Sequence, residues 1–232
     1  MKAMILCAGL GTRMGDLTKD MPKCMLQVAG KPILQHTLEC LKIEGIDQVV
    51  INLHHKAAKV VDYFGMEWQG TKIKYVYEQK LLGTAGAVRN ARHLLMDSEP
   101  FLVIYGDVLY FGDYQCYIKR HAERKATATI LYYQGKSNSN IITNQWGQVA
   151  HFYERPEEPV FGKVNTGIYI CSHEIFKWVP DGFCDFPAHV FQQPEVLNHC
   201  YADEIEGYRI AVDTPARLCN ANKDLGVFPW KK

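Results

Sequence analysis

Apolar residues recur along the first half of the chain in two alternating patterns. Short continuous apolar runs are typical of buried strands, and they cover residues 4–7, 48–53, 73–77 and 101–105. Segments with apolar residues at helical spacing lie between these runs, at residues 33–41, 56–64 and 84–95. Strands that alternate with helices in this way predict a mainly parallel sheet with right-handed crossovers.

The second half of the chain has a more mixed pattern. Residues 126–133, 149–153 and 167–171 read as strands, and residues 215–225 read as the last helix. We therefore expect a Rossmann-like three-layer α/β/α fold with a mainly parallel sheet and a partly antiparallel insertion. No repeat or long linker interrupts the chain, so we expect one domain over residues 1–232.

Composition adds mainly exclusions. The chain has 232 residues, 47% of them hydrophobic and 22% charged, with a formal net charge of +1. This balance is typical of a globular protein and suggests neither a nucleic-acid nor a membrane partner. The eight cysteines include no C-x-x-C pair, and no secretory signal precedes them. We expect reduced thiols and a cytoplasmic protein.

Ligands of open parallel sheets bind beyond the carboxyl ends of the strands. Here that rule selects the end of the 48–53 strand, residues 106–107, and residues 8–13, which hold Gly9, Gly11 and Arg13. Glycines allow positive φ and close approach of a ligand, successive amides can bind an anion, and arginine suits phosphate. Lys23 follows a proline and could point at the same site. An ordinary tight turn is the alternative, because neither the Rossmann fingerprint nor a P-loop is present.

Longer stretches of the chain resemble a known family. Residues 6–14, 17–18, 22–23 and 28–32 look like the opening signature of the sugar-phosphate nucleotidyltransferases. Further matches follow in the family's order at residues 83–87, 106–107, 154–156, 165–167 and 213–215. Asp16 and Cys24 stand where the family commonly has proline, which leaves the presumed phosphate ligands in place. The resemblance implies the nucleotide-diphospho-sugar transferase type of fold.

The resemblance also implies roles for individual residues. Nucleotide binding falls to Leu6, Ala8, Gly9, Gly11, Thr12, Arg13, Lys23, Glu78, Gly83, Thr84 and Gly106. Binding of the sugar phosphate falls to Glu154, Arg155, Lys163, Asn165 and Thr166. Asp107 and Asp213 would hold Mg²⁺, which prefers oxygen ligands. Arg13, Lys23, Asp107 and Arg155 would be catalytic.

Several of these residues also have a purely structural interpretation. Asp213 precedes Pro215 and could cap a helix, and Thr84 could cap the alanine-rich helix after it. Arg155 replaces the family's lysine and could be a surface arginine. His54 and the next histidine are adjacent, without a carboxylate or cysteine cluster, so we expect them to be structural.

The activity implied joins a nucleoside triphosphate to a sugar 1-phosphate and releases pyrophosphate. The best match is GTP with a mannose- or heptose-type 1-phosphate, for polysaccharide biosynthesis. Uridylyl, cytidylyl or thymidylyl transfer to another sugar or phospho-alcohol is the alternative within the family. A glycosyltransferase that uses a nucleotide sugar and a non-catalytic nucleotide-binding protein are alternatives from other classes. A homo-oligomer is left open.

Overall fold

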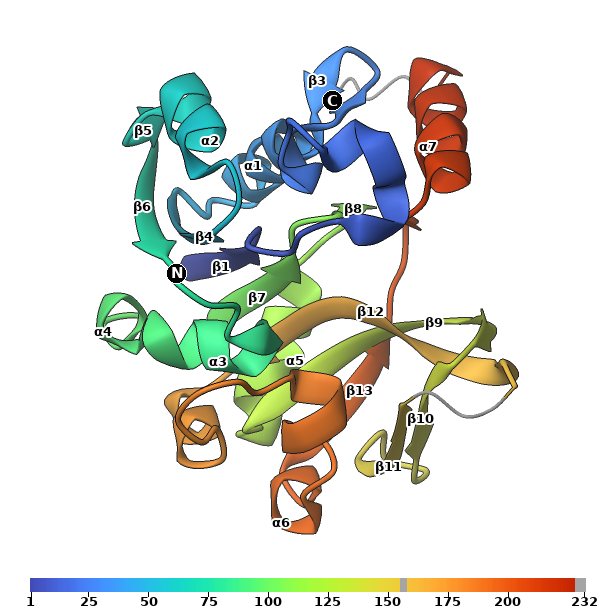
Figure 1. Ribbon diagram of the computed structural model, residues 1–232. Coiled ribbons are helices and arrows are strands. Elements are labelled where there is room, and N and C mark those ends of the chain that lie inside the picture. Colours follow the sequence, from blue (N-terminus) through green and yellow to red (C-terminus); the bar gives the residue numbers. More distant parts are fainter. Residues whose placement is uncertain (155–157, 228–232) are drawn as a thin grey trace.

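A large sheet forms the centre of the molecule, and its parallel region is built from the predicted strands (Figure 1). The structure, a computed structural model, describes residues 1–154 and 158–227. Within them the large sheet consists of β1 (Lys2–Leu6), β4 (Gln48–Leu53), β5 (Glu67–Trp68), β6 (Thr71–Tyr77), β7 (Phe101–Tyr105), β9 (Ala128–Ser137), β10 (Ser139–Thr143), β11 (Val149–Glu154), β12 (Val160–Cys171) and β13 (Cys200–Glu204).

The strand order is β11-β10-β12-β7-β1-β4-β6-β5, with β9 pairing to β12 and β13 to β9. Strands β7, β1, β4 and β6 run parallel, so their carboxyl ends meet at one edge. Strand β12 pairs antiparallel with both β7 and β9, and β10 with β11 extends this antiparallel region. The expected α/β fold with an antiparallel insertion is therefore confirmed.

Helices cover both faces of the sheet, as the labels in Figure 1 show. They are α1 (Ile33–Ile43), α2 (Ala57–Phe64), α3 (Gly83–Asn90), α4 (Arg92–Leu95), α5 (Gln115–Arg124), α6 (Pro194–Leu197) and α7 (Pro215–Val227). Strand β1 shows why two faces are needed, since its successive side chains point to opposite sides. Ala3 and Ile5 pack in a cluster with α1 and α2, while Met4 packs in a cluster with α3.

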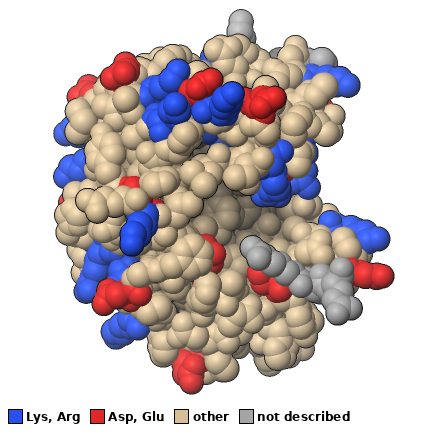
Figure 2. All heavy atoms as spheres, in the orientation of Figure 1, with Lys and Arg blue, Asp and Glu red and all other residues tan. Residues whose placement is uncertain are grey.

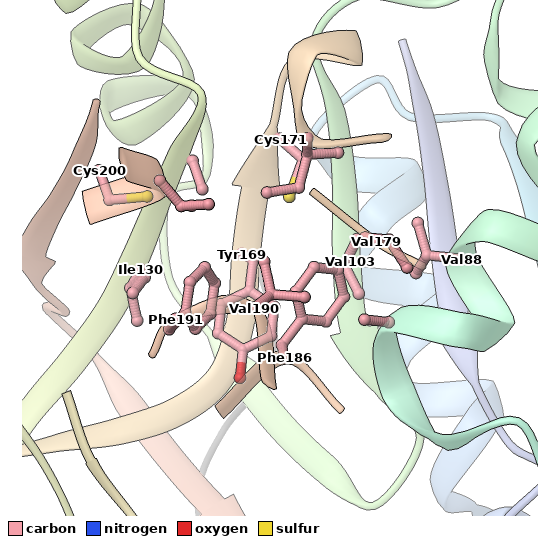
Figure 3. Packing of buried hydrophobic residues seen from close by; sticks show 14 of the residues in the cluster. Val88, Val103, Ile130, Tyr169, Cys171, Val179, Phe186, Val190, Phe191 and Cys200 are labelled. Carbon is pink, nitrogen blue, oxygen red and sulfur yellow. The ribbon is translucent and has the colours of Figure 1, made fainter. Parts of the chain in front are cut away.

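The second of these clusters contains an aromatic group beneath β12 (Figure 3). The ring of Tyr169 lies 5.2 Å from that of Phe186 and 5.3 Å from that of Phe191. Phe186 belongs to a single π-helical turn, η4 (Phe186–Val190), which follows residues 182–185. This packing anchors a segment that also borders the candidate site.

Local differences from the sequence-based expectations have simple causes. The helix predicted over 84–95 is two helices, because Ala91 interrupts α3 and α4. Helix α5 was not predicted, since the residues that it buries are Tyr117 and His121 rather than an aliphatic stripe. No helix among the described residues combines the length and apolar character needed to cross a membrane.

Candidate active site

A cavity of about 290 Å³ opens at the carboxyl ends of the parallel strands. Figure 2 shows the molecule hollowed on one side, with Lys and Arg side chains on the rims of the hollow. The predicted metal ligand Asp107 lines the cavity together with many of the predicted nucleotide ligands: Leu6, Ala8, Gly9, Lys23, Glu78, Gly83, Thr84 and Gly106. Residues from β1, β4, β6 and β7 thus converge as the strand-end rule predicts.

The glycine loop after β1 has two glycines with different surroundings. A Cβ at Gly9 would meet no atom within 4 Å, so this backbone is open to a ligand. Gly11 has φ +66°, and a Cβ there would lie 3.0 Å from Thr18 Cγ2. Its carbonyl accepts a hydrogen bond from the hydroxyl of Thr18 (3.0 Å), while Thr12 begins the 3-10 helix η1 (Thr12–Thr18). Gly11 therefore shapes the turn, and Gly9 is the residue that a phosphate can approach.

Lys23 and Asp107 meet at one end of the cavity. Lys23 begins a short 3-10 helix, η2 (Lys23–Met25), directly after Pro22. Its Nζ lies 2.5 Å from Asp107 Oδ2, and the two side chains are only 18% and 16% exposed. The structure thus pairs the lysine predicted to bind phosphate with the aspartate predicted to bind a metal ion, although 84 residues separate them in the chain.

Asp213 carries a second, more exposed group of charges. Arg13 Nη1 lies 2.7 Å from Asp213 Oδ2, and Arg217 Nη1 lies 2.8 Å from Oδ1. Strand β14 (Tyr208–Ala211) pairs with β8 (Val108–Phe111), and the N–H of Val212 donates to the carbonyl of Asp107 at 2.7 Å. That pairing brings the two aspartates to the same end of the site. The sequence pattern missed Arg217, which lies one helical turn after Asp213.

The two aspartates fit the ligand chemistry of Mg²⁺. Mg²⁺ is commonly held by one or two carboxylates together with substrate phosphates and water. In residues 1–154 and 158–227, no cluster of three or more His, Cys, Asp or Glu side chains could hold a metal ion. Asp107 and Asp213 therefore suit an ion that arrives with a phosphate ligand better than a cage made of protein alone.

The opposite end of the cavity is a buried hydrogen-bond chain. The N–H of Cys7 donates to Asn52 Oδ1 (2.8 Å), and Asn52 Nδ2 donates to Glu78 Oε1 (2.7 Å). The other carboxylate oxygen, Oε2, accepts from the N–H of Leu82 (2.9 Å). Glu78 is 6% exposed and yet lines the cavity. Asn52 stands at the strand end that the rule selected, but the sequence-based prediction gave it no role.

His54 supports this end of the site from outside. Its Nδ1 donates to the backbone carbonyl of Glu78 at 2.7 Å. The histidine is therefore structural, as expected, and it fixes the chain just before the turn at Gly83.

The turn at Gly83 is built against a segment about a hundred residues away. The N–H groups of Ala85 and Gly86 both donate to the carbonyl of Cys184 (2.9 Å each). The N–H of Thr84 donates to Asp185 Oδ1 (2.8 Å), and the Thr84 hydroxyl accepts from the N–H of Phe186. The start of α3 is thus capped by Asp185 rather than by Thr84.

Close approach of this segment explains both glycines of the turn. Gly83 has φ +74°, and a Cβ there would lie 2.6 Å from the Cys184 carbonyl oxygen. A Cβ at Gly86 would lie 2.5 Å from the carbonyl oxygen of Gly182. Asp185 also lines the cavity, and no motif in the sequence marks it.

The predicted sugar-side residues lie outside this cavity. Asn165 Oδ1 accepts from the N–H of Gly167 (3.1 Å), and the buried Thr166 hydroxyl donates to the Leu131 carbonyl (2.6 Å). Lys163 Nζ donates to the Thr143 hydroxyl. Glu154 lines a neighbouring hollow that shares Phe183 and Asp185 with the cavity. Arg155 lies outside the described residues.

Two thiols complete the wall beside Lys23. Cys7 and Cys24 both line the cavity. A hydrogen bond with Cys24, together with burial, raises the pKa of the Cys7 thiol well above its usual value. Cys7 therefore stays protonated at neutral pH and is a poor nucleophile.

The family is decided by comparison with known proteins. The profile of the nucleotidyl transferase family matches residues 2–182. The chain belongs to the nucleotidyl transferase family. It is 34% identical over 201 residues to a UTP–glucose-1-phosphate uridylyltransferase of Synechocystis, an alignment that covers 78% of this chain and 52% of the relative.

A second relative comes from Dictyostelium discoideum. The chain is 30% identical over 221 residues to the mannose-1-phosphate guanylyltransferase catalytic subunit beta of that organism, covering 93% of this chain and 62% of that one. This nucleotidyl transferase chain thus spans roughly half to three fifths of the length of these relatives.

Solved structures share the fold. The crystal structure of HddC from Yersinia pseudotuberculosis complexed with GMP-PN superimposes with a TM-score of 0.80 at 24% identity, covering 97% of this chain and 99% of that chain. At that identity the match establishes the architecture of this nucleotidyl transferase rather than its ligands.

Proposed function

We propose that this protein joins a nucleoside triphosphate to a sugar 1-phosphate, forming a nucleotide sugar and pyrophosphate. The Lys23–Asp107 pair carries the proposal. It joins a lysine that could bind phosphate to a carboxylate that could bind a metal ion, at one end of a cavity beyond the strand ends. Arg13 and Asp213 repeat the same combination beside it. The names of the Synechocystis and Dictyostelium relatives, both sugar-1-phosphate nucleotidyltransferases, support this reaction class.

The reaction needs no general base. A phosphate monoester has a second pKa of about 6, so the attacking oxygen is largely ionised at neutral pH. This oxygen forms a bond to the α-phosphorus, and the bond from that phosphorus to the pyrophosphate oxygen breaks. Lys23 and Arg13 would hold the triphosphate in line and stabilise the charge that moves onto pyrophosphate. Mg²⁺ held by Asp107 and Asp213 would supply further charge neutralisation.

The same cations are paired with the metal carboxylates before substrate binds. Lys23 contacts Asp107, and Arg13 contacts Asp213. When the triphosphate arrives with its ion, each cation would transfer from a carboxylate to phosphate oxygens. This exchange keeps the carboxylates and the cations compensated in both states, so neither charge is left alone in the partly buried site.

Guanine is the base that the buried end of the cavity favours. A carboxylate only accepts hydrogen bonds, and each of its oxygens can accept more than one. Guanine presents two adjacent donors, N1–H and N2–H₂, whereas uracil and thymine flank their single N3–H with carbonyl oxygens. The Glu78 carboxylate would repel those oxygens. GTP is therefore the proposed triphosphate.

A mannose- or heptose-type 1-phosphate is the proposed acceptor. The name of the Dictyostelium relative supports mannose 1-phosphate. Glu154 and Asn165 would bind sugar hydroxyls, with Lys163 and Thr166 supporting the strand that carries Asn165. The hollow that Glu154 lines adjoins the nucleotide cavity, as an in-line reaction between two substrates requires.

The test is a pyrophosphate-release screen of four triphosphates against a panel of sugar 1-phosphates with Mg²⁺. GTP with mannose 1-phosphate should give the highest rate. No pyrophosphate from any pair would contradict the proposal. Release of a nucleoside diphosphate from a supplied nucleotide sugar would instead support a glycosyltransferase, and nucleotide binding without turnover would support a binding protein.

A further inference from the structure

Arg209 lies on β14, beside Thr166 of the predicted sugar side and on the strand that leads to Asp213. Its Nη2 donates to the backbone carbonyl of Thr166 (2.8 Å). The guanidinium also lies over the ring of Tyr133, 5.0 Å from the ring centre. Thr166 follows Asn165 in a bulge of β12 that is predicted to bind sugar, so this arginine ties that bulge to the strand that leads into Asp213.

The charge of Arg209 lacks a direct carboxylate partner. Arg13 and Arg217 each contact Asp213, and Lys23 contacts Asp107. Among the described residues, by contrast, no carboxylate oxygen lies within 4.0 Å of the Arg209 guanidinium. The contacts that it does make, to a carbonyl and to an aromatic ring, are to neutral groups.

Burial destabilises the charged form of this guanidinium, and a bound anion would offset that cost. Burial lowers the pKa of Arg209, the charge of Arg217 acts in the same direction, and Asp107 and Asp213 partly offset both. Its Nε is buried and has no hydrogen-bond partner within residues 1–154 and 158–227. Buried donors are nearly always paired in folded proteins, so an unpaired one next to a substrate site points to a ligand.

The position of Arg209 says which anion would bind. Asp213 follows the end of β14 by two residues, and the charges of Asp107 and Asp213 both act on the Arg209 guanidinium, so this side chain lies within reach of the field of the two aspartates. Arg13 and Lys23 already serve the triphosphate end of the site in the proposed function. In the proposed function, the anion between the predicted sugar-binding bulge of β12 and the aspartates is the phosphate of the sugar 1-phosphate.

We propose that Arg209 binds the phosphate of the sugar 1-phosphate and holds it for attack on the nucleotide. The inference rests on the proposed function, which it extends by a residue that no motif marks. A guanidinium suits this task because its planar fork can donate to two phosphate oxygens while another N–H stays on Thr166. An incoming phosphate would also supply the counter-charge that the buried guanidinium lacks.

Steady-state kinetics of Arg209→Met and Arg209→Lys test the proposal. Loss of a charged hydrogen bond should raise KM for mannose 1-phosphate about 30-fold in Arg209→Met, with KM for GTP changed less than about threefold. The KM of Arg209→Lys for mannose 1-phosphate should lie between those of the unaltered protein and Arg209→Met. Added guanidinium ion should partly restore activity to Arg209→Ala. An equal rise in both KM values, or an unchanged KM for mannose 1-phosphate, would overturn the proposal.

Arg124 provides the matched control. It too lies 5.0 Å from a tyrosine ring, that of Tyr201, but it is on α5 and pairs with Asp203. Arg124→Met should lower the melting temperature without changing either KM. A purely structural role for Arg209 would give this same result in Arg209→Met, and that outcome also counts against the proposal.

Direct binding separates this inference from the proposed function. Calorimetry with mannose 1-phosphate and the unaltered protein needs no turnover. If the screen finds no pyrophosphate release but Arg209→Met still weakens this binding about 30-fold, the phosphate site stands while the proposed reaction fails. Equal binding by the unaltered protein and Arg209→Met would overturn the phosphate site, whatever the screen shows.

Discussion

The two ends of the cavity hold their polar groups in different ways. At the base end, Asn52 and Glu78 form a buried chain of hydrogen bonds that begins and ends on backbone N–H groups. At the phosphate end, Lys23 and Arg13 are held by aspartates, and Arg13 remains 67% exposed. One end is complete before a ligand arrives, while the other must exchange its partners.

This difference between the two ends suggests different tasks. In the proposed function, the base end would select the nucleotide and the phosphate end would support turnover. In that function, a fixed acceptor such as Glu78 would discriminate between bases because rearranging it would leave buried donors unpaired. Arg13 is the exposed partner of its ion pair with Asp213, so a triphosphate could take the place of that carboxylate at little cost. Substitutions at the two ends should therefore fail in different ways.

Asp107→Asn should have the largest effect. The amide loses the charge needed to hold Mg²⁺, so kcat/KM should fall about 10³-fold while the fold is kept. Pyrophosphate release and circular dichroism would measure the two properties. Asp97→Asn is the control, since it removes the carboxylate of an ion pair with Lys2, which begins β1 at the edge of the sheet opposite the site. Normal magnesium-dependent activity in Asp107→Asn would remove this residue from the metal site.

Lys23→Ala should be the next largest. Removal of a charged donor at the phosphate end should raise KM for the triphosphate about 30-fold and leave the base preference unchanged. Lys31→Ala provides the comparison, because Lys31 pairs with Glu39 on the surface. Identical kinetics across all triphosphate concentrations would show that Lys23 does not contact the nucleotide.

Glu78→Gln should break the base end. A glutamine cannot accept from both Asn52 and Leu82, so one buried donor loses its partner and the free energy of unfolding should fall by about 2 kcal/mol. The preference for GTP over UTP should fall with it. Urea unfolding and competition kinetics measure these effects, with the exposed Glu67→Gln as control. A stable variant with an unaltered base preference would disprove the proposed role.

Gly83→Ala and Gly9→Ala should give the smallest effects, and each should affect a different property. Gly83→Ala should lower stability, whereas Gly9→Ala should weaken triphosphate binding. Gly83 needs left-handed backbone, so alanine should cost about 1–2 kcal/mol of stability, with contact against Cys184 adding to it. Gly9 faces open space, so Gly9→Ala should stay within about 0.5 kcal/mol of the unaltered protein and chiefly weaken triphosphate binding. Equal stability losses would contradict the assignment of Gly9 to the ligand.

The sequence predicted those features that depend on local patterns. Buried parallel strands are continuous apolar runs, so β1, β4 and β7 were found, and the strand-end rule then brought residues 8–13, the end of β4 and Asp107 to one rim. The resemblance added Glu78 and the Gly83 turn.

Other features depend on pairings between distant segments, which no local pattern encodes. Asp185 reaches the site only because residues 182–186 dock on the Gly83 turn. Arg209 lies on β14, which the pairing with β8 holds in place, and contacts Thr166 of β12. The end of β4 was predicted at the rim, but the bond that joins Asn52 to Glu78 was not.

The docking of residues 182–186 on the Gly83 turn also limits how this protein can be recombined with its relatives. The carbonyl of Cys184 accepts from two amides of the turn, and Gly83 and Gly86 leave no room for a bulkier chain. A chimera that joined residues 1–110 of this chain to the remainder of a relative would separate a pair of surfaces shaped for each other. The Gly83 turn and residues 182–186 therefore have to be exchanged together. A chimera designed to take the base preference of a relative would need both segments from the same parent.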